Sequence, residues 1–269
     1  MKILDLTVET HSAMQYGLKE YEMIHPDLFA HYFRYWANRE NFSDNIISRN
    51  DLELRRELVC NSLQSVIQSI EDYGLPADNI TVILFTGQNT SNGHAFMNKD
   101  EITVWIPVET YHTTLQAQVF LTHEIIHGIH YLLSPDFSFG NESERVHTGR
   151  QLITEGVATY FTMRALGISE SEALWADFLS EQKIDEWIAD CRRRLTELKA
   201  HCRKTFSNSD GKSGLFHADD PSDIFRYRAG YFVGLEFVKW MADKQRTEHE
   251  ILQLPRRNLE QSALAYVSF

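Results

Sequence analysis

The residues of this sequence best suited to chemistry lie in one short segment, His123-Glu124-Ile125-Ile126-His127. On an α-helix of 3.6 residues per turn, positions i and i+4 share a face, so both imidazoles can reach one metal ion. Glu124 then lies beside the ion without binding it, where a carboxylate can take a proton from water. The pattern H-E-x-x-H therefore predicts a hydrolytic zinc site, with His123 and His127 as ligands and Glu124 as general base.

A catalytic zinc ion takes three protein ligands and a water, so a third ligand must follow along the chain. The pattern H-E-x-x-H-x-x-G-x-x-H is excluded, because position 133 is Leu133. The other solution is a glutamate on the next helix, and Glu155 is the candidate, early in a helical segment that contains small residues. Three further histidines remain open as additional ligands, although a neighbouring or surface position is favoured for each: His130, His147 and His217.

The surrounding patterns predict the elements that position these residues. One helix from about 113 to 133 carries the histidines, and a second from about 151 to 166 carries Glu155. Two β-rich runs, 80–85 and 102–106, precede the first helix and predict a small sheet with a hairpin-like pair. A last strong helix is expected over 224–244. The fold class is therefore α+β, and mostly helical.

The same patterns divide the chain into three regions. Residues 1–76 are expected to be an N-terminal helical region, 77–245 a catalytic domain, and 246–269 a C-terminal tail without clear secondary structure. Since 269 residues fit one large domain, we expect these regions to form one compact unit overall.

Charge and hydropathy narrow the class of partner. The net charge of −12 and a pI near 5.4 argue against nucleic-acid binding, which depends on Lys and Arg. A run of about 18 apolar residues would indicate a membrane span, and the sequence contains none. Asp5 and Glu9 interrupt any apolar core of a signal peptide, so the expected location is the cytoplasm. The oligomeric state is not indicated.

The segment Glu155-Gly-x-Ala-Thr-Tyr resembles the third-ligand segment of the gluzincin metallopeptidases, and the order of sheet and H-E-x-x-H helix is similar to their catalytic domain. Among them, the chain looks most like a bacterial family of predicted zinc-dependent proteases of uncharacterised substrate. The resemblance implies a zincin-like fold with one Zn²⁺ per chain and a small sheet before the active-site helix. It also implies that the strand around 103–106 is the edge strand, which pairs with an extended peptide.

The resemblance also implies a residue that stabilises the oxyanion. In gluzincin aminopeptidases a Tyr-x-Lys-Gly segment supplies this tyrosine, and Tyr227-Arg228-Ala229-Gly230 is similar, so Tyr227 is the candidate. The chain departs from the family in three ways. Between His127 and Glu155 lie 27 residues, more than in the aminopeptidases, and their Gly-Ala-Met-Glu-Asn motif is absent. Thermolysin-like members have an Asp at the position of Thr159.

Together these features predict a zinc-dependent metallopeptidase that hydrolyses a peptide or protein substrate, with His123, His127 and Glu155 as ligands. Two alternatives stay open: a catalytically inactive zinc-binding protein of the same fold, and a zinc hydrolase that acts on non-peptide amides. Glu124 counts against the first, because a purely structural zinc site does not need an adjacent carboxylate.

Overall fold

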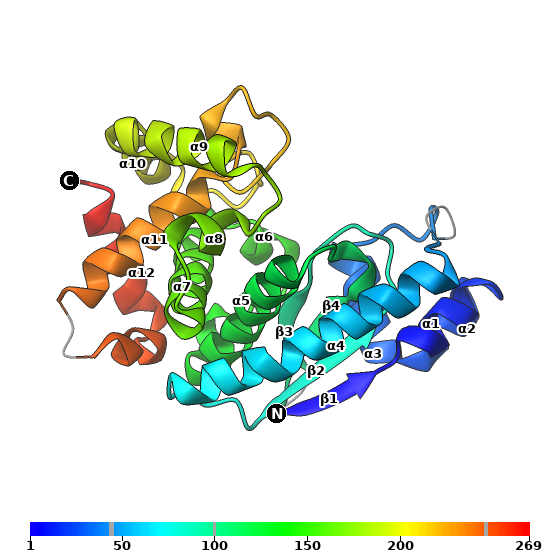
Figure 1. Ribbon diagram of the computed structural model, residues 1–269. Coiled ribbons are helices and arrows are strands. Elements are labelled where there is room, and N and C mark those ends of the chain that lie inside the picture. The colour runs from blue at the N-terminus through cyan, green and yellow to red at the C-terminus, as the bar shows by residue number, and fades with distance from the viewer. Residues whose placement is uncertain (43–45, 99–100, 245–246) are drawn as a thin grey trace. The chain divides into compact units, whose positions relative to one another are not determined.

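The computed structural model describes residues 1–42, 46–98, 101–244 and 247–269. The chain forms two compact units, residues 1–128 and 129–269. The boundary falls inside one continuous helix, α5 (Thr114–Leu133). The division expected at 1–76, 77–245 and 246–269 stays a prediction. Figure 1 labels the helices and strands along the chain.

The first unit contains a mixed sheet of four short strands in the order β1-β2-β4-β3. They are β1 (Lys2–Asp5), β2 (Ile80–Phe85), β3 (His94–Asn98) and β4 (Glu101–Pro107). β2 pairs in parallel with both β1 and β4, and only β3 is antiparallel to its neighbour, β4. The expected hairpin of 80–85 with 102–106 is therefore wrong, since those two strands are parallel.

The edge of the sheet also differs from the expectation. The strand around 103–106 lies inside the sheet, and β3 forms the edge next to it. The sequence did not indicate β3, because His-Ala-Phe-Met-Asn has no β-branched residue and no clear alternation. β1 was not expected either, since the first 75 residues were predicted to be helical.

Alternation along the strands buries both faces of this sheet. On one face, Ile80, Ile102 and Val104 lie against Gly128 of α5. On the other face, Ile83, Phe85 and Trp105 belong to an aromatic core. Its other members come mainly from three short helices, α1 (Thr7–Met14), α2 (Leu18–Ile24) and α3 (Pro26–Tyr35). The sheet thus holds α5 at a defined position.

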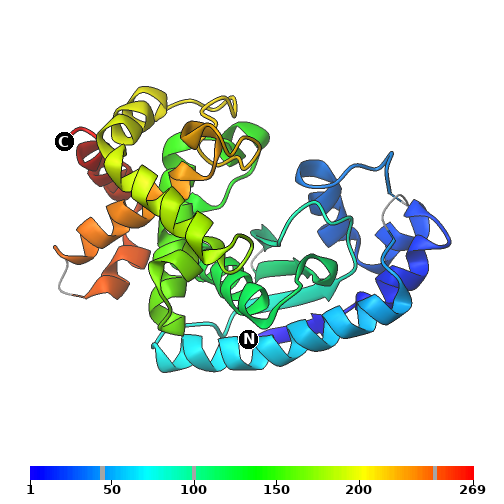
Figure 2. The ribbon, with the colours of Figure 1, turned by 45° about the horizontal axis from the view of Figure 1, so that its top comes forward.

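The long helix of the first unit is α4 (Arg49–Asp72), which Figure 2 shows in full. Its buried residues recur at helical spacing: Leu52, Val59, Leu63, Val66 and Ile70. The helix begins after Ser48, whose hydroxyl accepts a hydrogen bond from the Asp51 N–H group. Behind β4, the turn η1 (Val108–Thr110) leads into α5.

The second unit is helical. Its elements are η2 (Pro135–Phe137), α6 (Glu142–Arg145), α7 (Thr148–Leu166), α8 (Glu170–Trp175), α9 (Glu181–Arg193), α10 (Leu195–Thr205), η3 (Ile224–Arg226), α11 (Ala229–Ala242), η4 (Glu248–Gln253) and α12 (Arg256–Tyr266). α7 and α11 pack backbone to backbone, because a Cβ atom on Gly156 would lie 2.4 Å from the carbonyl carbon of Gly234. The C-terminal tail, for which no structure was expected, contains α12.

The predicted fold class is confirmed: an α+β protein, mostly helical, with a small sheet that precedes the helix of the H-E-x-x-H motif. Within the described residues, no helix has both the length and the apolar character needed to cross a membrane.

Candidate metal centre

Helix α5 presents the two histidines of the motif to a common point. The Nε2 atoms of His123 and His127 are 3.1 Å apart, and both side chains are buried. Two ligand nitrogens at the usual zinc distance, in tetrahedral geometry, would lie about 3.3 Å from each other. The spacing of the pair therefore suits two ligands of one ion.

A glycine sets the position of this helix on the sheet. A Cβ atom on Gly128, the residue after His127, would lie 3.0 Å from the side chains of Ile102 and Val104. A side chain at this position would force these sheet residues to shift by a few tenths of an ångström, so glycine allows the close packing of α5 on the sheet. Three isoleucines within or next to the motif are fully buried and hold this part of α5 in the core: Ile125, Ile126 and Ile129.

Glu124 is buried beside the pair and contacts the chain segment that leads into β3. A Cβ atom on Gly93 would lie 3.0 Å from Glu124 Cγ and 3.0 Å from the carbonyl oxygen of Trp105. Gly93 also has a φ of +144°, which side chains rarely adopt. Only glycine fits at this position, so the backbone of this segment forms a wall against the expected general base.

Two buried side chains hold that wall in place. The Glu109 carboxylate accepts hydrogen bonds from the backbone N–H groups of Gly87 and Asn89, each at 3.0 Å. Burial raises the pKa of Glu109, and these two bonds act in the opposite direction. The hydroxyl of Tyr111 donates to the carbonyl of Asn92. Burial, and next the negative charge of Glu124, raise the pKa of Tyr111.

The sequence analysis identified neither Gly93, Glu109 nor Tyr111. For Gly93 a signal exists in the turn-rich segment from Gly87 to Gly93, which separates two β-rich runs. The local sequence carries no such signal for Glu109 and Tyr111. What they do follows only from contacts with residues far along the chain.

Glu155 is half-buried in the second turn of α7. Two features fix this helix within the second unit. His147 caps its N-terminus, as the Nδ1 atom accepts a hydrogen bond from the Arg150 N–H group at 3.1 Å. Gly156, next to Glu155, makes the close contact with Gly234 of α11. Because residue 156 is glycine, α7 can pack closely against α11 next to Glu155.

Within the described residues, one group of three His, Cys, Asp or Glu side chains could hold a metal ion. It consists of His123, His127 and Glu155, and a ligand atom from each lies within 4.8 Å of the other two. Two imidazoles and one carboxylate are a donor set of hydrolytic zinc sites. The side chains therefore fit the ion that the sequence predicts.

The other three histidines considered as ligands are not part of this group. His130 is fully buried on α5, with its ring 4.5 Å from that of Phe137. His147 serves as the helix cap. His217 is exposed in a loop, 3.9 Å from the Asp219 carboxylate.

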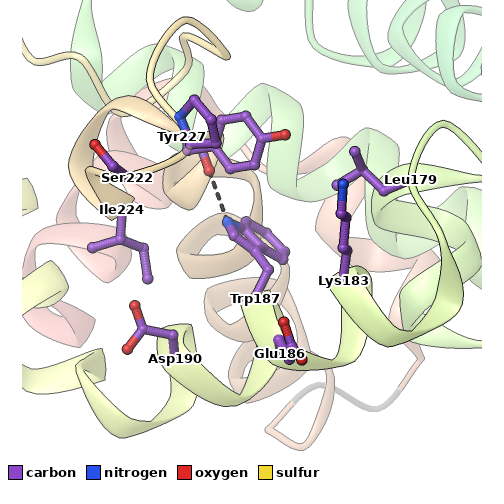
Figure 3. Close-up of a pocket in the computed structure, with 9 residues that line it drawn as sticks. Leu179, Lys183, Glu186, Trp187, Asp190, Ser222, Ile224 and Tyr227 are labelled. Atoms are coloured by element: carbon purple, nitrogen blue, oxygen red, sulfur yellow. Dashed lines mark hydrogen bonds between the residues drawn. The ribbon is translucent and has the colours of Figure 1, made fainter.

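Tyr227 lies between η3 and α11 in the second unit, on the wall of a pocket. Its ring is 5.1 Å from that of Trp175, and its carbonyl accepts a hydrogen bond from the Trp187 indole at 2.9 Å (Figure 3). The contact with Trp175 thus holds the Tyr227 ring at the wall of the pocket.

Residues 56–261 match the model of a family described as Predicted Zn-dependent protease (DUF2268). Neither the curated proteins nor the solved structures contain a match. The matched segment covers most of the chain and includes the motif on α5 and Glu155 on α7. The chain therefore belongs to this family of predicted zinc-dependent proteases.

Proposed function

We propose that this chain is a zinc-dependent metallopeptidase of the gluzincin type, which hydrolyses peptide bonds in a peptide or protein substrate. His123, His127 and Glu155 would hold the zinc ion. The observation that carries the proposal is the close grouping of their ligand atoms around one point, next to the buried carboxylate of Glu124.

Zinc, when bound, lowers the pKa of its water to about 7 and polarises the carbonyl of the scissile bond. The chain's own residues would do the rest. Glu124 accepts the proton of the attacking water and later delivers it to the leaving nitrogen. The backbone around Gly93 packs against the Glu124 side chain and limits its movement. The hydroxyl of Tyr227 would donate a hydrogen bond to the oxyanion of the tetrahedral intermediate.

The edge strand gives the substrate a surface to pair with. β3 is antiparallel to β4 and ends the sheet in the described residues. An extended peptide can add to such an edge through backbone hydrogen bonds. Since Gly93 directly precedes β3 and contacts Glu124, a peptide on this edge would lie next to the general base.

Two alternatives predict different behaviour. A zinc-binding protein without catalysis would bind the ion and hydrolyse nothing, yet the burial of Glu124 beside the ligands suits a proton carrier. A hydrolase of non-peptide amides would use the same residues on another substrate. A mixed library of quenched fluorescent peptides separates both alternatives from the peptidase.

The first experiment is the zinc content per chain, measured by elemental mass spectrometry on wild type and Glu155→Ala, purified identically. We expect about one zinc in the wild type. Loss of a ligand should weaken zinc binding at least about 100-fold, since even residues behind the ligands cost 10- to 100-fold.

A matched control is Glu181→Ala, which removes an exposed glutamate from the start of α9 and should keep the zinc. Full zinc in Glu155→Ala would move the third ligand to another side chain. Zinc in neither protein would refute the proposal.

A further inference from the structure

The second unit contains a pocket of which only one lining residue, Tyr227, has a role in the proposed chemistry. Its volume is about 410 Å³, within the range of about 300 to 1,000 Å³ typical of small-ligand sites. One wall is helix α9 and the other is the segment from Pro221 to Tyr227 (Figure 3). The lining residues are Leu179, Lys183, Glu186, Trp187, Asp190, Pro221, Ser222, Ile224 and Tyr227.

The floor of the pocket is a fixed aromatic surface. Trp187 is buried, and its indole N–H donates to the Tyr227 carbonyl at 2.9 Å. The Trp187 ring stands edge-on to that of Trp175, at 5.2 Å, and Tyr227 packs on the same Trp175. Two aromatic rings of the lining are thereby held in place before any ligand arrives, which lowers the entropic cost of binding.

The charged residues of the pocket lining, Lys183, Glu186 and Asp190, all come from α9. Lys183, Trp187 and Asp190 occupy positions i, i+4 and i+7 of one helix face. At 1.5 Å per residue, Lys183 and Asp190 begin about 10 Å apart along the axis. Figure 3 shows Lys183 and Asp190 on opposite sides of Trp187. Glu186 lies between them along the helix. The pocket has one cationic end and one anionic end.

The anionic end can accept a cation. Asp190 pairs through Oδ1 with Arg193, a side chain that is 77% exposed. Glu186 accepts a hydrogen bond from Gln182 at 2.9 Å, also on the solvent side. A carboxylate has room for about four hydrogen bonds, so these contacts leave capacity for a ligand. A cation over the face of Trp187 is further attracted by the ring.

We propose that this pocket binds the side chain of a lysine or arginine of the substrate peptide. The apolar stem would cross Trp187 and Ile224, and the charged head would meet Asp190 and Glu186. This inference rests on the proposed peptidase function. The hydroxyl of Tyr227 points to the Lys183 side in Figure 3, so the peptide backbone belongs at that end, next to the expected oxyanion donor.

The test is a binding measurement on the full chain in the Glu124→Gln background, in which hydrolysis should be slowed about 10²- to 10⁴-fold. The probes are three pentapeptides, acetyl-Ala-Ala-X-Ala-Ala-amide, with X as Arg, Leu or Glu, titrated in a calorimeter. We expect the Arg peptide to bind about tenfold more tightly than the Leu peptide, and the Glu peptide most weakly.

Asp190→Asn should remove that tenfold preference, so that the Arg peptide binds no more tightly than the Leu peptide. Asp185→Asn, an exposed residue of the same helix outside the pocket, is the matched control and should change nothing. Arg193→Ala removes the competing cation and should tighten binding of the Arg peptide. Equal affinity for the Arg and Leu peptides, or an unchanged preference in Asp190→Asn, would overturn the inference.

Its failure can be told from that of the proposed function. A protein without zinc or turnover that still prefers the Arg peptide keeps the pocket assignment as a binding site and refutes the peptidase. An active peptidase whose binding and cleavage ignore basic residues refutes the pocket assignment alone.

Discussion

The two helices that carry the ligand candidates, α5 and α7, are positioned in different ways. On α5 the chemistry is local, because His123, Glu124 and His127 lie within one turn and a sheet behind Gly128 supports that turn. On α7, Glu155 depends on a helix cap and on one backbone contact, Gly156 with Gly234 of α11. The arrangement of the clustered motif residues can therefore be predicted from their spacing in the sequence. The position of the isolated ligand candidate Glu155 depends on how its helix packs.

The largest effect is expected for Glu124→Gln, which tests the proposed general base on α5. The amide has nearly the shape of the carboxylate but cannot accept the proton of water, so turnover should fall about 10²- to 10⁴-fold. The zinc content should not change, because the proposed ligands, His123, His127 and Glu155, are untouched. Hydrolysis of the best library peptide and elemental analysis of the same sample measure both effects.

Glu71→Gln, on the exposed surface of α4, is the matched control for the Glu124 variant and should behave as wild type. Turnover within threefold of wild type in Glu124→Gln would remove Glu124 from the role of general base.

On the α7 side, Gly156→Ala tests the packing that supports Glu155. The new methyl group would lie 2.4 Å from the Gly234 backbone, which cannot rotate away as a side chain can. The free energy of unfolding should fall by about 1 to 3 kcal/mol or more, as in other overpacked cores. Urea denaturation measures it.

Gly140→Ala is the control in the same unit, since a Cβ atom there meets nothing within 4 Å. Its free energy of unfolding should stay within about 0.5 kcal/mol of wild type. Equal free energies of unfolding for the two variants would show that the close contact between α7 and α11 does not contribute to stability.

The smallest effect is expected at the cap of α7. His147→Ala removes the hydrogen bond to the Arg150 N–H group and should cost about 0.5 to 2 kcal/mol of stability. The pH dependence is more specific. Burial lowers the pKa of His147, with smaller effects from Arg256 and Arg150 in the same direction and from Glu260 in the opposite one.

The sign of that dependence follows from the lowered pKa. Above pH 6.5, His147 is neutral in the folded and in the unfolded chain. As the pH falls below 6.5, the unfolded chain takes up the proton first, so stability is lost until the pH passes the folded pKa. His147→Asn keeps a capping side chain and should lose less stability than wild type between pH 7.5 and 5.5. Parallel losses in urea denaturation would exclude His147 as the source.

Much of the secondary structure was accessible from local patterns. The runs at 80–85 and 102–106 are β2 and β4, and the helix expected from 113 to 133 is α5. Ser169 and Glu172, three residues apart, form a capping box at the start of α8. Gly167 ends α7 in the left-handed conformation, as its position after a helical run predicts. Each of these features depends on residues within a few positions of one another.

Features that depend on distant partners were missed. β1 and β3 are short strands whose pairing with β2 and β4 stabilises them more than their own composition does. The direction of pairing between β2 and β4 was also wrong, since both directions bury the same apolar residues. Glu109, Tyr111 and Gly93 act on the candidate site only through contacts that span the fold.

The local pattern was sufficient to place His123, Glu124 and His127 on one helix face, because the helical period is a local property of the backbone. The sequence also named Glu155 as a carboxylate on the next predicted helix. Only the tertiary structure decided that the ligand atoms of these residues group together, that Gly93 contacts Glu124, and that Trp187 and Tyr227 form one pocket. Those contacts join residues far apart in the chain, and their geometry depends on helix packing and strand register, which no local pattern specifies.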